Sequence, residues 1–387
     1  MPDPAGPLAG VRVLDFSTTF SGPYATHLLA ELGADVLKVE APHGDVTRAL
    51  GTATAPGIGS VYAGANRNKA SVVLDLKDPA GRETAHALVA RADCLVHNMR
   101  PAAAARLRID AATATEINPR LVYASITGYG SDGPYADRPA YDDVIQAMSG
   151  LAWLQGLNEP EPGYVATPIA DKVAGLMLSH AVLAALYWRA QSGRGQCIEV
   201  PMYETMVGFT LLEQWGGRAV TPPAGPTGYA RLRSAHRRPY RTADGMISVV
   251  VYHDGHWSRF LAAVGRAELL SDPRYRTAEA RNHHIGDLYE MLAGLLPQRT
   301  TEDWLELFAG IDVPAVPVKS LDEVFDDRHL AEVGFFQEVR GESGTRYLAA
   351  RPAVRFSGSP APDPRDLPGP SALGAATAAR WLEPRTP

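Results

Sequence analysis

The sequence has little of what marks several large classes of protein. Cysteine occurs only twice in 387 residues, as Cys94 and Cys197. Two distant cysteines supply neither a disulfide framework, nor a CxxC redox pair, nor a cysteine zinc site. The formal net charge of −6 excludes a uniformly basic nucleic-acid-binding protein. Hydrophobic residues make up 45% and charged residues 21%, which is globular composition and excludes a disordered tail, a collagen or a coiled coil.

Signals for secretion and membrane insertion are also missing. The first residues, MPDPAGPLAGVRVLDFS, contain no basic segment followed by an apolar one, so no signal peptide is expected. The longest uncharged run, residues 173–188, falls short of the ~20 apolar residues that span a bilayer. We therefore expect a soluble, reduced, cytoplasmic protein with neither nucleic acid nor a membrane as partner.

Several common catalytic motifs are absent as well. The sequence contains no GxSxG, no GxxxxGK[ST] and no HExxH, and STTFSGP stands where a dinucleotide-binding GxGxxG would follow the first strand. His253 and His256, and the adjacent His283 and His284, are spaced like metal ligands. Neither pair has a third ligand nearby, so we interpret them as ordinary surface or packing histidines. No metal site is expected.

Strand-like and helix-like patterns alternate through the first half. Short β-branched runs alternate with helical apolar spacing, closed in one case by Gly33 as a helix-ending glycine. This alternation predicts an α/β fold with a parallel sheet covered on both faces. We expect strands over 11–16, 35–40, 71–76, 94–97, 121–127 and 197–201, and helices over 25–32, 81–92 and 169–188.

The amino-acid composition changes after residue 200. A Pro-, Gly- and Arg-rich stretch begins at Thr221 and is typical of a linker or loop. Beyond it we expect a smaller α+β domain over about 225–325, with a strand in 242–252 and helices over 256–264, 285–295 and 303–308. The sequence contains no internal repeat.

Residues that follow the strands are the first candidates for a binding site. Ligands of parallel sheets lie at the carboxyl ends of the strands, which here are followed by residues 17–22, 40–44, 77, 98–101 and 128–133. Four of the five lysines, Lys38, Lys69, Lys77 and Lys172, fall at strand ends or helix starts, which suits a phosphate-bearing ligand. The alternative is that these lysines are solvated loop charges.

Asp171 is the strongest single candidate for chemistry. It stands at the start of the most apolar predicted helix, so one interpretation is a helix N-cap that accepts backbone N–H bonds. The other is a carboxylate nucleophile, which attacks an activated acyl group while helix N–H donors stabilise the developing negative charge. The residues alone leave both open.

Several segments together resemble the class III CoA-transferase family, which includes carnitine CoA-transferase, formyl-CoA transferase and α-methylacyl-CoA racemase. They extend over almost the whole chain in the expected order. The segments are PLAGVRVLDFS, GPYATHLLAELGADVLKVEAP, NRNKASVVLDLK, GYGSDGPYADRPAYD, IADKVAG, SGRGQ, PYRTADG and DPRY.

The resemblance implies a Rossmann-like, CoA-binding large domain over 1–200, a linker over 201–224, a small α+β domain over 225–325 and a C-terminal segment, 326–387, that returns to the large domain. It also implies an interlocked homodimer. Asp171 matches the family's catalytic aspartate, which forms an aspartyl anhydride and then an aspartyl-CoA thioester. Coenzyme A is then a substrate and product, an acyl-CoA and a carboxylic acid are the partners, and no bound cofactor is needed.

Substrate-binding positions carry over from the resemblance in the same way. They follow the predicted strands or precede the Asp171 helix. These positions are Thr19, Phe20, Ala41, Leu74, Lys77, Asn98, Met99, Arg106 and Tyr141.

Departures from the family pattern narrow the choice among the reactions that the family catalyses. Racemases of the family have a histidine where this chain has Tyr141, and a tyrosine with a reference pKa near 10 is a poor base for an α-proton. Transferase is therefore favoured over a 2-methylacyl-CoA racemase, while a non-catalytic acyl-CoA-binding protein also stays open and an oxidoreductase ranks last. Phe20 replaces a glutamine common in formyl-CoA transferases, which argues against oxalate or formate.

One basic loop is a candidate binding site for the acceptor acid. Residues 231–238 contain Arg231, Arg233, Arg237 and Arg238 together with His236. Arginine binds carboxylates through two parallel hydrogen bonds. We hypothesise that one of these arginines clamps the second carboxylate of a dicarboxylic acceptor; the alternative is a solvated basic linker.

Overall fold

The computed structural model describes residues 6–55, 57–340, 346–362 and 374–383. The chain divides into two units. Unit 1 comprises Met1–Ala152, Tyr164–Phe209 and His329–Pro387, and unit 2 comprises Trp153–Gly163 and Thr210–Arg328.

Unit 1 is built on a six-stranded, fully parallel sheet, which confirms the α/β prediction. The strand order is β5-β2-β1-β6-β7-β8, so the chain builds outward from β1 in one direction and then returns to build in the other. Ligands of such sheets bind where this reversal leaves a crevice, here between the ends of β1 and β6. The strands are β1 (Arg12–Asp15), β2 (Asp35–Glu40), β5 (Lys69–Val73), β6 (Cys94–His97), β7 (Val122–Thr127) and β8 (Gln196–Pro201).

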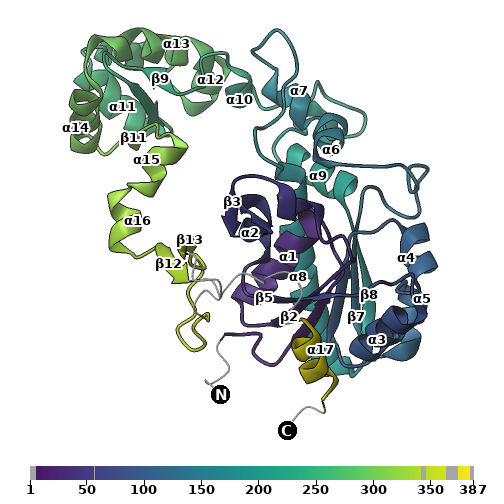
Figure 1. Cartoon of the computed structure of the whole chain (residues 1–387). Helices are drawn as coiled ribbons and strands as arrows, with labels where there is room; N and C mark the ends of the chain where they lie inside the picture. Colours follow the sequence, from purple (N-terminus) through teal and green to yellow (C-terminus); the bar gives the residue numbers. More distant parts are fainter. Residues whose placement is uncertain (1–5, 56, 341–345, 363–373, 384–387) are drawn as a thin grey trace. The chain divides into compact units, whose positions relative to one another are not determined.

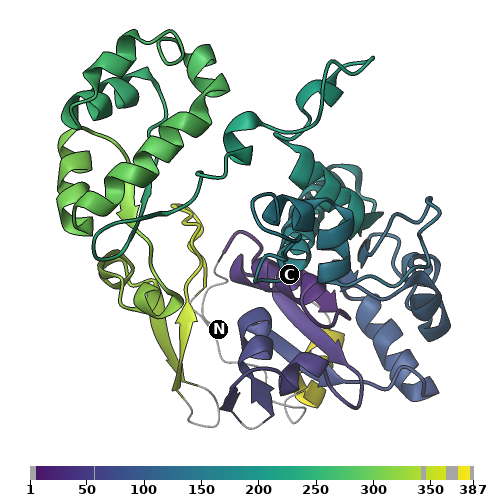
Figure 2. The same cartoon turned by 90° about the horizontal axis from the view of Figure 1, so that it is seen from above.

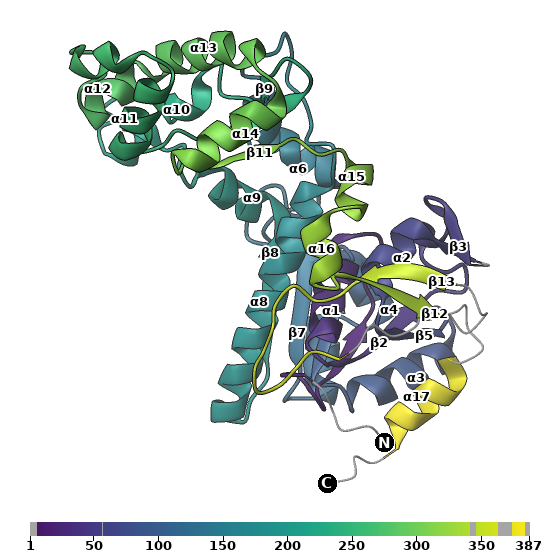
Figure 3. The same ribbon diagram turned by 90° about the vertical axis from the view of Figure 1, so that its left-hand side faces the viewer.

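Helices cover both faces of this sheet (Figure 1). On one face α1 (Ser21–Glu31) and α8 (Ile169–Ser192) pack together against Val13, Val96 and Ala124. Figure 3 shows α8 running beside β7 and β8. On the other face, α3 (Pro79–Val89) and α17 (Gly374–Leu382) share a core with Leu14, Leu37 and Leu95. Helices on both faces explain why nearly every residue of β1, β2, β6 and β7 is buried, rather than every second one.

Local sequence signals set the ends of several helices. The Asp78 side chain accepts from the Gly81 N–H, and Pro79 opens α3 without losing a bond. Gly33 adopts φ 95 just beyond α1, a left-handed conformation that glycine takes without strain. Residues 35–40 and 94–97 are strands with the predicted limits, whereas the strand expected at 71–76 lies at 69–73.

Unit 1 contains further elements that the sequence patterns did not predict. Most are short helices in the loops after the strands, and two are small antiparallel hairpins. They are β3 (Ala53–Ala55), β4 (Ile58–Gly59), α2 (Ser60–Asn66), α4 (Pro101–Leu107), α5 (Ala111–Ile117), α6 (Asp142–Met148), α9 (Met202–Leu211), β12 (Phe336–Arg340), β13 (Arg346–Ala350) and the 3-10 turn η1 (Val46–Ala49). The segment expected as a linker, 201–224, thus begins with a helix.

Unit 2 has its own core, which includes Trp257, Phe260, Trp304 and Phe308, and a three-stranded antiparallel sheet. Its helices are the green ribbons of Figure 2. Among the described residues its sheet contains β9 (Tyr240–Arg241), β10 (Met246–Val249) and β11 (Ala315–Pro317). Its helices are α10 (Ala230–Arg233), α11 (Asp254–Ala263), α12 (Ala278–His283), α13 (Ile285–Leu295), α14 (Thr301–Gly310) and α15 (Leu321–Phe325). Helix α7 (Leu151–Gln155) and helix α16 (Arg328–Glu332) lie at the unit boundaries.

One helix of the described part of the chain, α8, is long and apolar enough to cross a membrane by length and composition. Core helices of soluble proteins pass the same test. Ala174, Leu178 and Val182 of α8 are fully buried in the core of unit 1.

Candidate active site

Asp171 lies in the first turn of α8 and lines a cavity of about 280 Å³. We call this the Asp171 cavity. Its other walls come from the loops after β1, β6 and β7, at the carboxyl edge of the sheet. The N-cap of α8 is Pro168, with no side-chain capping bond, so the interpretation of Asp171 as the N-cap is wrong. Its carboxylate is left for another role.

Two helices begin at this carboxylate. Asp171 is the third residue of α8, and hydrogen bonds connect it to Ser21, the first residue of α1. Helix N-termini carry partial positive charge and free N–H groups, so both ends stabilise an anion here. Burial nevertheless raises the pKa of Asp171 to about 6, and the neighbouring carboxylate of Asp142 adds to the rise. The bonds to Ser21 act in the opposite direction.

Asp142 takes over the capping role that Asp171 does not play. Its Oδ1 accepts from the Asp171 backbone N–H at 2.9 Å, and its Oδ2 accepts from Gln146 Nε2 at 2.6 Å. The Gln146 Oε1 accepts in turn from the Val165 N–H at 2.9 Å. Gln146 is fully buried. This chain of bonds fixes the loop that enters α8 and holds a second carboxylate beside the first.

We expect Asp142→Asn to move the acidic limb of the pH profile of kcat/KM to lower pH. In the parent protein that limb should lie near pH 6, where Asp171 ionises. Removing the Asp142 charge removes one cause of the raised pKa, so Asp171 ionises more readily. The introduced amide retains an oxygen to accept from the Asp171 N–H. The control is Asp143→Asn, which removes an exposed charge from the same helix turn and should leave the limb in place. An unmoved limb in Asp142→Asn would contradict this account of Asp171.

Two hydrogen bonds of the Asn98 side-chain amide connect the loops that follow β1 and β6. Asn98 Oδ1 accepts from the Thr18 N–H at 2.9 Å, and Asn98 Nδ2 donates to the Thr18 carbonyl at 2.7 Å. Asn98 thus binds the loop after β1 as a neighbouring strand would. The next residue, Thr19, has φ 71, a left-handed conformation that is uncommon for a β-branched residue. Strong constraints from the surrounding structure are needed to hold it there.

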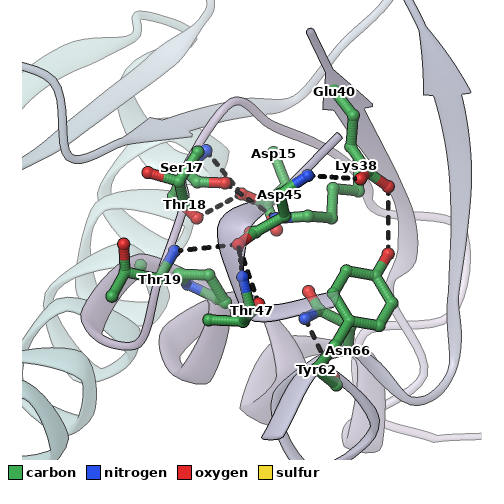
Figure 4. A network of polar contacts seen from close by, with 12 residues as sticks. Asp15, Ser17, Thr18, Thr19, Lys38, Glu40, Asp45, Thr47, Tyr62 and Asn66 are labelled. Carbon is green, nitrogen blue, oxygen red and sulfur yellow. Dashed lines mark hydrogen bonds and ion pairs between the residues drawn. The ribbon is translucent and has the colours of Figure 1, made fainter. Parts of the chain in front are cut away.

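A buried ionic network supplies those constraints (Figure 4). Asp15 Oδ1 accepts from both the N–H and the hydroxyl of Ser17, and Lys38 Nζ donates to the Ser17 carbonyl at 2.7 Å. Asp45 Oδ1 accepts from the Thr19 N–H at 3.4 Å, while its Oδ2 lies 3.0 Å from Lys38 Nζ. The network therefore fixes the turn that places Ser21 against Asp171.

Two of the lysines expected to meet a ligand belong to this interior. The side chains of Lys38 and Lys69 are fully buried, with Lys69 Nζ 3.0 Å from Asp15 Oδ2. Burial lowers the pKa of Lys69 to about 8, and Asp15 opposes that change. The phosphate-binding interpretation is therefore wrong for these two lysines, and so is the solvated alternative. Lys77 and Lys172 are exposed.

Helices α1 and α8 meet through backbone near Asp171. A Cβ on Gly175, one turn after Asp171, would lie 2.7 Å from the Ser21 carbonyl oxygen and 3.0 Å from the Tyr24 ring. Only glycine allows this approach. The distance between the two helix starts at Asp171 is therefore set by main-chain contact.

The cavity brings together part of the predicted site. Thr19, Asn98, Met99 and Tyr141 line it with Asp171. Ala41 and Leu74 directly follow β2 and β5, on the same carboxyl edge. Lys77 follows a few residues later, Arg106 is exposed on α4 and Phe20 is the N-cap of α1. These last five are not among the residues that line the cavity.

Ser21 and Arg100 are predicted only as members of the candidate ranges 17–22 and 98–101, and the sequence predicts no role for Arg138, Asp142 or Gln146. Arg100 and Arg138, both exposed, line the cavity and bring positive charge to it. Ser21, Asp142 and Gln146 act on Asp171 directly or through hydrogen bonds. The one signal available was position, because Arg100 follows a predicted strand and Ser21 follows the first strand. Nothing in the local pattern marks a buried glutamine as functional.

The histidine pairs show no metal-site geometry in the part of the chain the structure describes, where no cluster of three metal-ligating side chains occurs. His253 caps helix α11, its Nδ1 accepting from the His256 N–H at 3.3 Å.

Comparison with known proteins agrees with the resemblance. The model of CoA-transferase family III matches residues 8–376. This chain belongs to CoA-transferase family III. It is 33% identical over 376 residues to succinate–glutarate CoA-transferase of Agrobacterium fabrum, covering 93% of this chain and 92% of that protein. It is 35% identical over 337 residues to the succinyl-CoA–L-malate CoA-transferase beta subunit of Chloroflexus aurantiacus, covering 84% and 81%.

Solved structures of family III give the same fold. A CAIB/BAIF family protein from Brucella suis superposes with a TM-score of 0.83 at 31% identity, covering 97% of this chain and 100% of that one. The chain is thus a family III CoA-transferase by sequence and by architecture.

Proposed function

We propose that this enzyme moves CoA from an acyl-CoA to a carboxylic acid with Asp171 as the nucleophile. The observation that carries the proposal is the setting of Asp171, a carboxylate that faces a cavity where two helices begin. A pKa near 6 keeps this carboxylate largely ionised at neutral pH yet more basic than an exposed aspartate, which favours nucleophilic attack.

The chemistry proceeds through two kinds of covalent intermediate, a thioester and the anhydrides formed before it with the donor acid and after it with the acceptor acid. An Asp171 oxygen attacks the thioester carbonyl, the C–S bond breaks, and CoA leaves as the thiolate with an aspartyl anhydride left behind. The thiolate then attacks the aspartyl carbonyl and expels the donor carboxylate, giving an aspartyl-CoA thioester. The acceptor carboxylate attacks that thioester and releases the thiolate again. Attack of the thiolate on the acceptor's carbonyl gives the new acyl-CoA and regenerates Asp171.

The protein's contribution is electrostatic at each of these steps. Negative charge develops on a carbonyl oxygen as each tetrahedral intermediate forms, and fixed N–H donors stabilise such charge. The starts of α1 and α8 supply donors of this kind. We assign Leu74, Ala41, Thr19, Asn98 and Met99 to a CoA path along the ends of β5, β2, β1 and β6, with Lys77 meeting the phosphates at the β5 end. Arg106, on α4 beyond β6, is not assigned to this path.

Intact-protein mass spectrometry tests the mechanism. Brief incubation with acyl-CoA esters should give a CoA-sized adduct that hydroxylamine removes, and Asp171→Ala should give none. CoA binding without any adduct would overturn the mechanism. Solvent deuterium entering Cα of the ester without an acceptor acid would then identify a racemase, and no exchange of either kind would identify a binding protein.

We also propose that the active protein is an interlocked homodimer. Apolar side chains of α8 and α9 lie exposed on the single chain, including Leu176, Tyr187 and Phe209. Exposed apolar patches of this kind mark protein contacts. Light scattering should give twice the 41.5 kDa chain mass. Cys94 and Cys197 are free, which suits the cytoplasmic location that we propose.

For the acceptor we propose a dicarboxylic acid. The relatives named above act on succinate, glutarate and malate. In unit 2, Arg231 stacks on Tyr252 and the exposed Arg233 on Trp153, whereas the exposed Arg237 and Arg238 stack on no ring in the described part of the chain. We therefore assign the carboxylate clamp to Arg237 and Arg238. Alanine at both positions should raise the acceptor KM, and an unchanged KM would end the hypothesis.

A further inference from the structure

A second cavity, of about 490 Å³, adjoins the Asp171 cavity. The two share Met99, Pro101 and Thr127 in their walls. The remaining wall comes from the ends of β6, β7 and β8 and from the alanine-rich helices α4 and α5. We call it the β7–β8 cavity. Nothing in the mechanism above uses it.

Sheet order gives this cavity its place relative to the substrate. The proposed CoA path runs from Asp171 toward β1, β2 and β5, whereas β7 and β8 lie at the other end of the same edge. A thioester held at Asp171 therefore directs its CoA half one way and its acyl half the other. The acyl half points to the β7–β8 cavity.

The back wall carries an unused hydrogen-bond donor. His97 Nδ1 accepts from the Met99 N–H at 3.1 Å, so on the neutral ring the proton is on Nε2, which donates to Tyr123 Oη at 2.6 Å. Burial lowers the pKa of His97 to about 4 and keeps the ring neutral. The Tyr123 hydroxyl proton then has no acceptor among the residues that the structure describes. Because Tyr123 lines the cavity, this proton is available to a hydrogen-bond acceptor bound there.

The charge at the rim limits what can enter. Glu199 and Asp110 both line the cavity. Glu199 already accepts from Thr127 and Ser131, and Asp110 accepts from Thr113. Two carboxylates repel phosphates and a second carboxylate alike, while alanines and Ile198 favour apolar groups.

We propose that the β7–β8 cavity binds the far part of the acyl group of the CoA-ester substrate, an apolar chain that ends in an uncharged oxygen, and that the Tyr123 hydroxyl donates to that oxygen. This inference rests on the proposed function, because it takes the CoA half to lie toward β5. It makes the two exchanged acids different in kind, one a dicarboxylate and the other neutral at its far end.

Alkylation of Cys197 provides a test that needs no turnover. Cys197 is exposed and lines the cavity, whereas Cys94 is buried, so a single alkylation reports on occupancy. Iodoacetamide labelling is followed by intact mass with octanoyl-CoA, 7-oxooctanoyl-CoA, octanedioyl-CoA, acetyl-CoA and free CoA. The first two should protect Cys197, with the oxo ester effective at a concentration about two- to tenfold lower. Octanedioyl-CoA should need roughly tenfold more than octanoyl-CoA.

Two substitutions in the cavity wall distinguish the hydrogen bond from Tyr123 from the space that the cavity offers to an acyl chain. Tyr123→Phe should abolish the advantage of the oxo ester and leave protection by octanoyl-CoA. Ala105→Phe, which fills the cavity from α4, should abolish protection by both esters. Its control is Ala102→Phe, an exposed position on the same helix outside the cavity wall. Protection by free CoA would show that the cavity holds CoA and would overturn the proposal. So would the absence of protection by either neutral ester while calorimetry shows that it binds. Neither outcome depends on an Asp171 adduct, so failure here is distinct from failure of the transferase mechanism.

Discussion

Asp171→Asn should lose CoA transfer by on the order of 10³-fold or more, because the amide cannot form the anhydride. The same variant should be more stable than the parent. The folded-state pKa of Asp171, about 6, lies above the model value of 3.8, so folding favours the neutral form. At pH 8 the carboxylate therefore destabilises the native protein, and replacing it should raise the free energy of unfolding by about 1–3 kcal/mol.

The pH dependence of this stability difference between Asp171→Asn and the parent protein provides an internal control. As pH falls from 6 to 3.8, Asp171 becomes protonated in the folded protein first, so the advantage of asparagine should fade across that window. Urea unfolding at pH 8 and pH 4, beside steady-state transfer assays, measures both halves. A variant that is inactive and equally destabilised at both pH values would show that Asp171 has a structural role instead.

Lys38→Met should be the most damaging change away from the nucleophile. It removes a fully buried ammonium that lies 3.0 Å from Asp45 and donates to the Ser17 carbonyl. Removing one partner of a buried pair leaves an uncompensated charge, which costs about 3–5 kcal/mol. Urea unfolding measures the loss, and Lys77→Met, at an exposed lysine, should change stability by less than ~0.5 kcal/mol.

A double variant tests whether the pair itself carries this loss. Asp45→Asn keeps an oxygen that can accept from the Thr19 and Thr47 N–H groups but removes the charge, so it should recover part of the stability lost in Lys38→Met. A coupling free energy of about 1–3 kcal/mol is expected for residues in contact. Strictly additive effects would mean that Lys38 acts through Ser17 alone.

Acid should weaken the same network. The pKa of Asp15 lies well below its usual range, since Lys69, Lys38 and two hydroxyls outweigh burial, and the pKa of Glu40 is lowered to about 2 by Arg48 and Ser71 against burial. Carboxyls with lowered pKa values stabilise the fold above their unfolded pKa, and this contribution is lost as pH falls.

The sequence predicted the limits of those strands that depend on the local residue pattern alone. Residues 35–40 contain the β-branched and aliphatic residues Val36, Leu37 and Val39, residues 94–97 read CLVH, and both strands have the expected limits. The third strand starts at Lys69, two residues before its expected start, because Asp15 neutralises a lysine for which the sequence pattern suggested a phosphate or solvent. A pairing between residues 54 positions apart is not readable from either local segment.

The candidate site also contains residues that a local pattern predicts and residues that only the folded chain identifies. Asp171 could be found because its place before an apolar helix is a local pattern, and the family resemblance supports it. Asp142 and Gln146 act on it from another helix, α6, and Asp142 is 29 positions from Asp171, so only the folded chain identifies them. The cap at α8 was misassigned for the same reason, since its acceptor comes from another helix.

The main-chain contact at Gly175 has a consequence for laboratory evolution. Asp171 is placed by helix starts and a backbone contact, whereas Arg100, Arg138 and Tyr141 contribute side chains to the walls of its cavity. The position of Asp171 and the charge and shape of the cavity walls are thus encoded in separate parts of the chain. A library that randomises these three wall positions can explore new acids while Asp171 keeps its place.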